Sequence, residues 1–179
     1  MEIQLETAKA EHLEQYEEIL RAGRRFQQEQ GFIQWTENYP NRDTILEDIR
    51  FQRGYALLVD GAIAGYLCID FAGEPAYENI DGAWRTAGPY AVVHRLALSS
   101  DFRGRGLGDA AFRLAGELCL ARESCSLRAD TGFDNRRMQH ILVKNGFEKC
   151  GVISYQGSPR LAYEKTDLAD SMQTQIALE

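Results

Sequence analysis

The stretch that most constrains the fold is "DFRGRGLGDA" at residues 101–110, because it separates two elements of opposite type. The residues before it, "YAVVHRLAL" at 90–98, form an apolar run with the length of a buried strand. The residues after it, from 107 to 122, place apolar side chains on one face at helical spacing. The sequence therefore predicts a strand, a glycine loop and a helix in direct succession.

The composition of the glycine loop indicates what it binds. A helix that begins behind glycines offers backbone N–H groups and the positive end of its dipole, and the missing Cβ atoms let an anion come close. Three glycines and two arginines share the six residues from Arg103 to Gly108. A purely structural turn has no need of the arginine charge, so the pattern favours a phosphate ligand.

Two familiar phosphate loops fit less well. A Walker loop ends in Gly-Lys-Ser/Thr, whereas this one ends in Gly108-Asp109. A dinucleotide fingerprint requires G-x-G-x-x-G, and Asp130 does stand about 20 residues further on, where a ribose-binding acid belongs. However, Asp109 occupies the place of the third glycine, and an antiparallel hairpin precedes the strand. The dinucleotide interpretation is therefore the less favoured one.

The rest of the chain alternates strands and helices, which predicts an α/β fold around a mixed sheet. The hairpin is predicted at Asp60-Gly61, a dipeptide suited to a tight turn, and Asp43 is the predicted N-cap of a short helix. Residues 71–88 are predicted to be a long loop. The predicted strands are 2–8, 55–60, 62–70, 90–98, 126–131, 147–155 and 160–165, and the predicted helices are 10–30, 44–51, 107–122 and 136–146.

Charge and composition exclude several classes of partner. The chain of 179 residues has 20 basic and 27 acidic residues, and the net charge of -7 argues against nucleic acid and anionic membranes as partners. No apolar run is long enough to span a bilayer, and the acidic N-terminus does not resemble a signal peptide, so we expect a cytoplasmic protein. The four cysteines lie far apart, which predicts neither a zinc site nor disulfides, and no metal is expected.

The loop matches the pattern Arg/Gln-x-x-Gly-x-Gly/Ala through Arg103, Gly106 and Gly108. With "HRLAL" before the loop and "KNGFEKCGVI" after it, the chain resembles the GNAT superfamily of acyl-coenzyme A dependent N-acetyltransferases. The resemblance implies one domain over residues 1–165, followed by a tail at 166–179. It also implies a mixed, mostly antiparallel central sheet flanked by helices, with a V-shaped splay between the strands at 90–98 and 126–131.

The resemblance further implies acetyl-coenzyme A as co-substrate. Loop amides would hold its pyrophosphate, the strand before the loop would pair with the pantetheine arm, and Asn135 would hydrogen-bond that arm. Asn135 also suits a plain helix N-cap, and both roles can hold together; Met138 would touch the cofactor or belong to the core. The implied coenzyme A contacts are Leu96, Ala97, Leu98, Arg103, Gly104, Arg105, Gly106, Leu107, Gly108, Asn135 and Met138.

The resemblance assigns only some of the catalytic roles to residues of this chain. The family's oxyanion donor would be the backbone N–H of Leu98, but Leu142 stands where many members have a tyrosine acid, so the general acid stays unassigned. His94 and Glu78 are candidate bases. The alternatives are a core histidine for His94, and solvated loop charges for Glu78 and its neighbours Glu74 and Asp81.

The acceptor site is predicted near Trp35 and Tyr39, which could otherwise form a hydrophobic plug over the core. The predicted activity is acetyl transfer from acetyl-coenzyme A to a primary amine, by direct attack in a ternary complex. The acceptor would be a small molecule or a protein N-terminus, and a homodimer is compatible with the family. The alternative is a non-catalytic module that senses acyl-coenzyme A.

Overall fold

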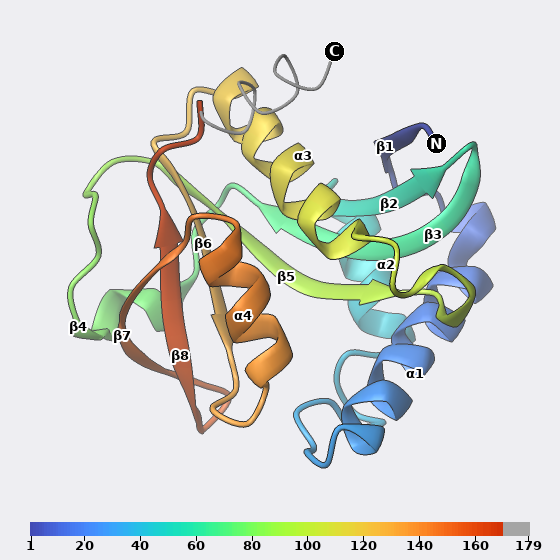
Figure 1. Ribbon diagram of the computed structural model, residues 1–179, viewed down its shortest axis with the longest axis horizontal. Coiled ribbons are helices and arrows are strands. Elements are labelled where there is room, and N and C mark those ends of the chain that lie inside the picture. Colours follow the sequence, from blue (N-terminus) through green and yellow to red (C-terminus); the bar gives the residue numbers. More distant parts are fainter. Residues whose placement is uncertain (170–179) are drawn as a thin grey trace. The chain divides into compact units, whose positions relative to one another are not determined.

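The computed structural model describes residues 1–169, so residues 170–179 of the predicted tail lie outside the described part of the chain. Two compact units are present. Unit 1 comprises Met1–Ile69 and His94–Ala111, and unit 2 comprises Asp70–Val93 and the described residues from Phe112 to Ala169. Strands and helices alternate as shown in Figure 1, which confirms the predicted α/β class.

Unit 1 holds four strands in the order β1-β2-β3-β5. They are β1 (Ile3–Thr7), β2 (Gly54–Val59), β3 (Ala62–Asp70) and the second half of β5 (Tyr90–Leu98). The ladders β1–β2 and β2–β3 are antiparallel. Asp60 and Gly61 join β2 to β3 with φ angles of 49° and 82°, which confirms the tight hairpin turn predicted there.

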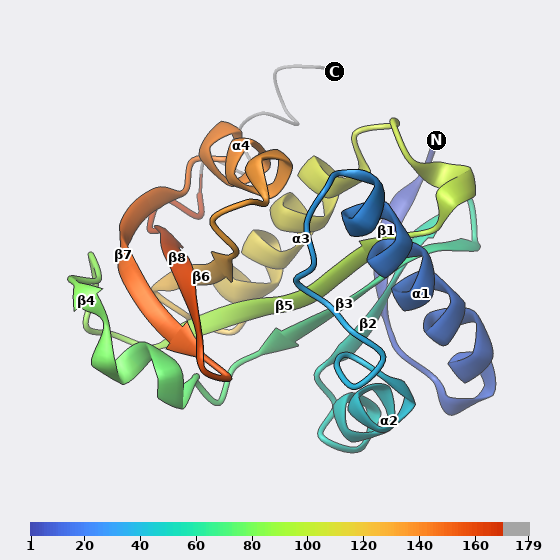
Figure 2. The same cartoon turned by 90° about the horizontal axis from the view of Figure 1, so that it is seen from below.

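The helices of unit 1 pack on its strands through apolar faces. They are η1 (Ala10–His12), a 3-10 helix, α1 (Leu13–Glu29) and α2 (Arg42–Arg50), seen beside β2 and β3 in Figure 2. Tyr16 of α1, Ile45 of α2 and Tyr66 of β3 are almost fully buried in one shared core. This packing fixes where α2 lies on the sheet.

The start of α2 differs from the prediction. Asn41, not Asp43, is the N-cap: its side chain accepts a hydrogen bond from the Thr44 N–H at 3.2 Å, while the Thr44 hydroxyl accepts one from the Asn41 N–H at 3.1 Å. Asp43 lies in the first turn instead, where its charge still suits the helix dipole. The helix therefore begins at Arg42.

Unit 2 continues the strand order as β5-β6-β8-β7-β4. Its strands are β6 (Ser126–Thr131), β8 (Ser158–Lys165), β7 (Glu148–Tyr155) and the short β4 (Asp81–Gly82), besides the first half of β5. The β5–β6 ladder is parallel and has three residue pairs, from Tyr90↔Ser126 to Val92↔Arg128, and the other ladders are antiparallel. The mixed, mostly antiparallel sheet is thus confirmed, and so short a ladder fits the predicted splay.

Helices cover both faces of the unit 2 strands. α4 (Arg136–Lys144) lies across β6 and β8 in both ribbon views, Figures 1 and 2. η2 (Pro75–Asn79) supplies Tyr77 to a core with Val92 and Ala162 on the other face. The remaining elements are η3 (Ser100–Phe102) and α3 (Leu107–Ala121), which directly follow β5 along the chain.

Residues 71–88 are therefore not the plain loop that was predicted, because they contain η2 and β4. Glu74 caps η2 by accepting the Ala76 N–H at 3.2 Å. β4 pairs with β7 so closely that a Cβ on Gly82 would lie 2.2 Å from the Cys150 carbonyl oxygen. This strand pairing needs glycine, and local sequence patterns do not reveal the pairing partner.

A buried carboxylate organises unit 2. Glu164 on β8 is 1% exposed and accepts hydrogen bonds from the Arg128 Nε at 2.7 Å, the Ser126 hydroxyl at 2.8 Å and the Thr86 hydroxyl at 2.9 Å. Burial alone would raise the pKa of Glu164, but these three donors lower it below its usual value. Glu164 is therefore held in its ionised form.

Candidate functional site

The glycine loop of unit 1 presents bare backbone in front of α3. Gly104 and Gly106 have φ angles of 78° and 71°, and a Cβ at either position would meet no protein atom within 4 Å. The Ala110 N–H donates to the Gly106 carbonyl at 3.1 Å, so the N–H groups of Leu107 and Gly108 lie in the first helical turn. The predicted helix N-terminus behind glycines is confirmed.

Both arginines of the loop make contacts within unit 1. The Arg103 guanidinium donates to the Ala22 carbonyl of α1 at 2.7 Å and lies 4.3 Å from the centre of the Phe26 ring. The Arg105 guanidinium donates to the Asp101 carbonyl at 3.2 Å. Arg103 thus ties the loop to α1 while its positive charge stays beside the loop.

Strand β5, which leads to this loop, contains one residue with irregular backbone geometry, Arg95. Arg95 has a φ angle of 56°, a left-handed conformation that is uncommon for a residue with a side chain and is often found at functional sites. Strict alternation along a strand would place His94 on one face with Leu96 and Leu98, and the left-handed residue between them breaks that alternation. His94, Leu96 and Leu98 are half-buried.

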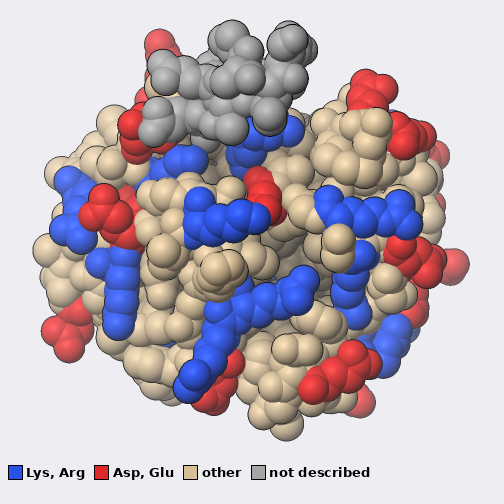
Figure 3. Space-filling model, in the orientation of Figure 1, with Lys and Arg blue, Asp and Glu red and all other residues tan. Residues whose placement is uncertain are grey.

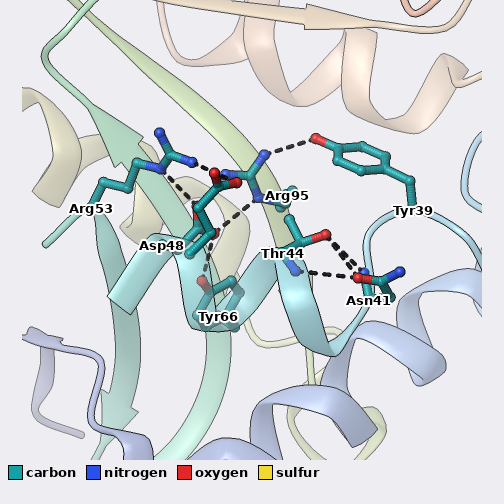
Figure 4. Close-up of polar contacts among 8 residues, drawn as sticks. Tyr39, Asn41, Thr44, Asp48, Arg53, Tyr66 and Arg95 are labelled. Carbon is teal, nitrogen blue, oxygen red and sulfur yellow. Dashed lines mark hydrogen bonds and ion pairs between the residues drawn. The ribbon is translucent and has the colours of Figure 1, made fainter. Parts of the chain in front are cut away.

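The side chain of Arg95 enters a buried polar network, shown in Figure 4. Its Nε donates to Asp48 of α2 at 3.0 Å and its Nη1 donates to the Tyr39 hydroxyl at 2.7 Å. Asp48 also accepts from the Tyr66 hydroxyl at 2.7 Å and from the Arg53 Nε at 2.9 Å. Arg95 and Asp48 are 7% and 0% exposed, so the ion pair lies almost entirely out of water.

The network holds the segment before α2 against β5. Burial, together with the negative charge of Asp48, raises the pKa of Tyr66 far above its usual value, so its hydroxyl stays a neutral donor. Tyr39 is joined to β5 through Arg95. The conformation of the Tyr39 segment is therefore coupled to that of the strand.

Asp48 and Arg95 were not among the site residues predicted from the sequence. Two features of the sequence point to them. Asp48 lies three residues after Ile45, on the buried face of its helix, and Arg95 is a charge within an apolar strand. Buried charges require partners, but no local pattern tells which residue 47 positions away will be the partner.

Trp35 and Tyr39 have different surroundings. Trp35 is 9% exposed and belongs to the core of unit 1, and it also lines a pocket of about 190 Å³ between α1 and the segment before α2. We call this cavity the α1 pocket; its lining residues are Glu17, Leu20, Arg21, Arg24, Trp35, Thr36, Glu37, Pro40, Asn41 and Arg42. Tyr39 is absent from the lining and faces Arg95 instead.

The candidate residues of unit 2 have distinct environments. Asn135 is the N-cap of α4, since its side chain accepts the Met138 N–H at 3.1 Å. Met138 is half-buried, Leu142 is 0% exposed, and Glu78 is exposed on η2. The capping role of Asn135 is confirmed, and a role in cofactor binding stays a prediction.

Other features of the described residues bear on possible ligands. Within residues 1–169, no set of three His, Cys, Asp or Glu side chains is arranged to hold a metal ion. In the same range no helix is both long and apolar enough to cross a membrane. Figure 3 shows Lys and Arg side chains alongside Asp and Glu on the face that it draws, separated by uncharged surface.

Comparison with known proteins gives one family. The family described as "Acetyltransferase (GNAT) family" matches residues 13–147, which include β5, the glycine loop and α4. A solved acetyltransferase of the GNAT family from Streptococcus agalactiae 2603 has a TM-score of 0.84 and 32% identity, covering 92% of this chain and 95% of its own.

Two further relatives have more specific names. A structure of AAC(6')-Ib with paromomycin and acetyl-coenzyme A has a TM-score of 0.71 at 20% identity, covering 97% of both chains, a likeness of fold. A Bacillus subtilis protein, named as a candidate [ribosomal protein bS18]-alanine N-acetyltransferase, is 29% identical over 98 residues. That alignment covers 55% of this chain and 63% of the relative, so it spans less than two thirds of the relative's length.

Proposed function

We propose a function from one premise: this chain belongs to the GNAT acetyltransferase family. It transfers the acetyl group of acetyl-coenzyme A to a primary amine, by direct attack in a ternary complex. The observation that carries the proposal is the pair of left-handed glycines, Gly104 and Gly106, directly before the N-terminus of α3.

The loop fits a pyrophosphate group. The positions where Gly104 and Gly106 lack a Cβ face open space, so an anion can approach the backbone there. The first-turn N–H groups of Leu107 and Gly108 have no carbonyl to bind within the helix, and the helix dipole favours negative charge at this end. Support for this assignment also comes from the structure of AAC(6')-Ib solved with acetyl-coenzyme A.

The other coenzyme contacts are proposed from the family resemblance. The backbone of Leu96, Ala97 and Leu98 would pair with the pantetheine arm, which requires no particular side chain. Asn135 would bind the arm in addition to capping α4, and Met138 would contact it. The first role needs only the backbone of β5, and the other two need the side chains of Asn135 and Met138 at the start of α4.

The transfer has two electrostatic requirements. The amine must lose a proton before its nitrogen forms a bond to the acetyl carbon, and the carbonyl oxygen needs a donor as it gains charge. We assign the donor to the Leu98 N–H, and we keep His94 and Glu78 as candidate bases. The carbon–sulfur bond then breaks, the sulfur leaves as a thiolate, and the nitrogen loses its second proton to the base or to water as the amide forms.

Leu142 leaves the general acid of the reaction without a side chain in α4. It is fully buried in α4 and cannot donate a proton where many relatives have a tyrosine. A thiol has a reference pKa of about 8.5, so the thiolate can leave near neutral pH without an acid. The same leucine favours a second candidate function, a non-catalytic sensor of acyl-coenzyme A, and release of free thiol with a mixed panel of amines distinguishes the two.

Calorimetric titration with coenzyme A tests the loop assignment. Gly106→Val should weaken binding about tenfold or more, because the branched side chain strains the left-handed backbone and covers the N–H donors. Gly157→Val is the matched control, since Gly157 has a φ angle of 76° and equally open space, but lies in the β7–β8 turn. Equal affinity in both folded variants would contradict the assignment.

A further inference from the structure

The α1 pocket carries an inference about the acceptor, which rests on the proposed function. We infer that the acceptor is a small amine that also carries a carboxylate group, of the size of an amino acid, and that Arg24 binds this carboxylate. Four observations support it: the position of the pocket, its charge, the pairing of its arginines and its volume.

One wall of the α1 pocket, Trp35, lies close to β5, the strand that leads to the glycine loop. The Trp35 ring packs so closely on α1 that a Cβ at Gly23 would lie 2.8 Å from it. The same Cβ would lie 3.2 Å from the Ala97 side chain on β5. Trp35 and Ala97 therefore pack around the same point of α1, which brings this wall of the α1 pocket close to β5.

The pocket contains more positive than negative charge. Its lining has three arginines, Arg21, Arg24 and Arg42, and two glutamates, Glu17 and Glu37. An acceptor with several ammonium groups, such as an aminoglycoside, would bring its charges against these guanidinium groups. The charge of the lining therefore disfavours a polycation and favours a ligand that carries a negative group.

The arginines differ in whether their charge is already compensated. Arg42 is paired with Glu17 at 2.9 Å, and Arg21 is paired with Glu18 at 3.1 Å. Arg24 is half-buried, and it has no ion pair or hydrogen bond to any residue within 1–169. A half-buried guanidinium gains most from a carboxylate, which it can bind with two parallel hydrogen bonds.

Glu37 supplies a negative charge in the same pocket. It is exposed at the pocket and, like Arg24, has no ion pair within the described residues. An alkyl amine arrives from water as an ammonium ion, which a carboxylate attracts. One cation and one anion without partners in a single pocket suit a ligand that carries both charges.

The volume limits the ligand to a small one. Pockets for drug-sized molecules measure about 300–1,000 Å³. The α1 pocket measures about 190 Å³, which suits a compound of amino-acid size better than an oligosaccharide.

The test uses matched substrates and matched variants. The substrates are a panel of L-amino acids, their carboxamides, in which the carboxylate is neutralised, and kanamycin as a polycation. The proteins are the wild type, Arg24→Gln and Arg25→Gln; Arg25 is the neighbour on α1, is paired with Glu18 at 2.8 Å and does not line the pocket. Thiol release with acetyl-coenzyme A gives kcat/KM for each combination.

We expect at least one amino acid to exceed its carboxamide about tenfold or more in kcat/KM, because a hydrogen bond to a charged group contributes that much. Arg24→Gln should remove this preference by lowering kcat/KM for the amino acid toward that for its carboxamide, whereas Arg25→Gln should keep the preference. Transfer to kanamycin or to carboxamides at equal or higher kcat/KM would overturn the inference, as would a preference that survives Arg24→Gln.

Failure of the proposed function gives a different result. If no amine is acetylated, calorimetric titration of the coenzyme A complex with the same amino acids decides. Binding that Arg24→Gln abolishes and Arg25→Gln preserves supports the pocket assignment, and absence of binding in the wild type overturns it.

Discussion

The buried pair of Asp48 and Arg95 makes a strong prediction about stability. In Asp48→Asn, the amide keeps the shape of the carboxylate but loses its charge, so the Arg95 guanidinium remains buried at 7% exposure without compensation. Asp48 accepts hydrogen bonds from Arg53 and Tyr66 as well, and an amide can satisfy fewer of these donors. Breaking a buried pair in this way costs about 3–5 kcal/mol.

The loss should be visible in thermal and urea denaturation. For a chain of this length, each kcal/mol shifts Tm by about 2–4 °C, so Asp48→Asn should lower Tm by roughly 6–20 °C. Glu18→Gln is the control, because Glu18 forms ion pairs with Arg21 and Arg25 whose side chains are about half exposed, and such pairs contribute about 0–1 kcal/mol. If Asp48→Asn lost no more stability than Glu18→Gln, the buried network would not have the stabilising role that its geometry indicates.

Two further predictions concern unit 2. Asn135→Ala should lower the free energy of unfolding by about 1 kcal/mol, because α4 loses its cap, and should also raise KM for acetyl-coenzyme A. Asn41→Ala, which removes the cap of α2, should lower stability without raising KM. If the two variants had equal KM values, Asn135 would act as a cap alone. Because Glu164 has a lowered pKa in the folded state, its contribution is complete above the usual value of 4.5 and is lost as the pH falls through the folded value. When the midpoint of urea unfolding is measured between pH 3 and 7, Glu164→Gln should therefore lose less stability than the wild type as the pH falls. An unchanged pH dependence would show that other groups cause the loss of stability in acid.

The parts of the fold that the sequence predicted correctly depend on neighbouring residues. Asp60-Gly61 forms its hairpin because both residues tolerate the left-handed region, and Asn135 caps α4 because its side chain reaches an N–H three residues ahead. The glycine loop belongs to the same class. Each is determined within a few residues of chain.

The features that were predicted wrongly or missed depend on residues far apart in the sequence, or on a choice between two residues that are equally suited to one role. Asn41 and Asp43 are both good capping residues, so residue type alone does not decide between them. β4 exists because Gly82 meets Gly151, and the Asp48 site exists because Arg95 comes to it from 47 residues away. No periodic pattern contains these pairings.

The contact of Gly23 with Trp35 and Ala97 has a consequence for how relatives of this protein diverge. Because a Cβ at Gly23 would displace the Trp35 ring, the packing of α1 against Trp35 helps to determine the width of the α1 pocket. One substitution on the far side of the tryptophan, such as Gly23→Ala, would reshape the cavity without touching the glycine loop. Under the role that we propose for the α1 pocket, acceptor preference would then change over evolutionary time while the loop proposed to bind coenzyme A stays the same.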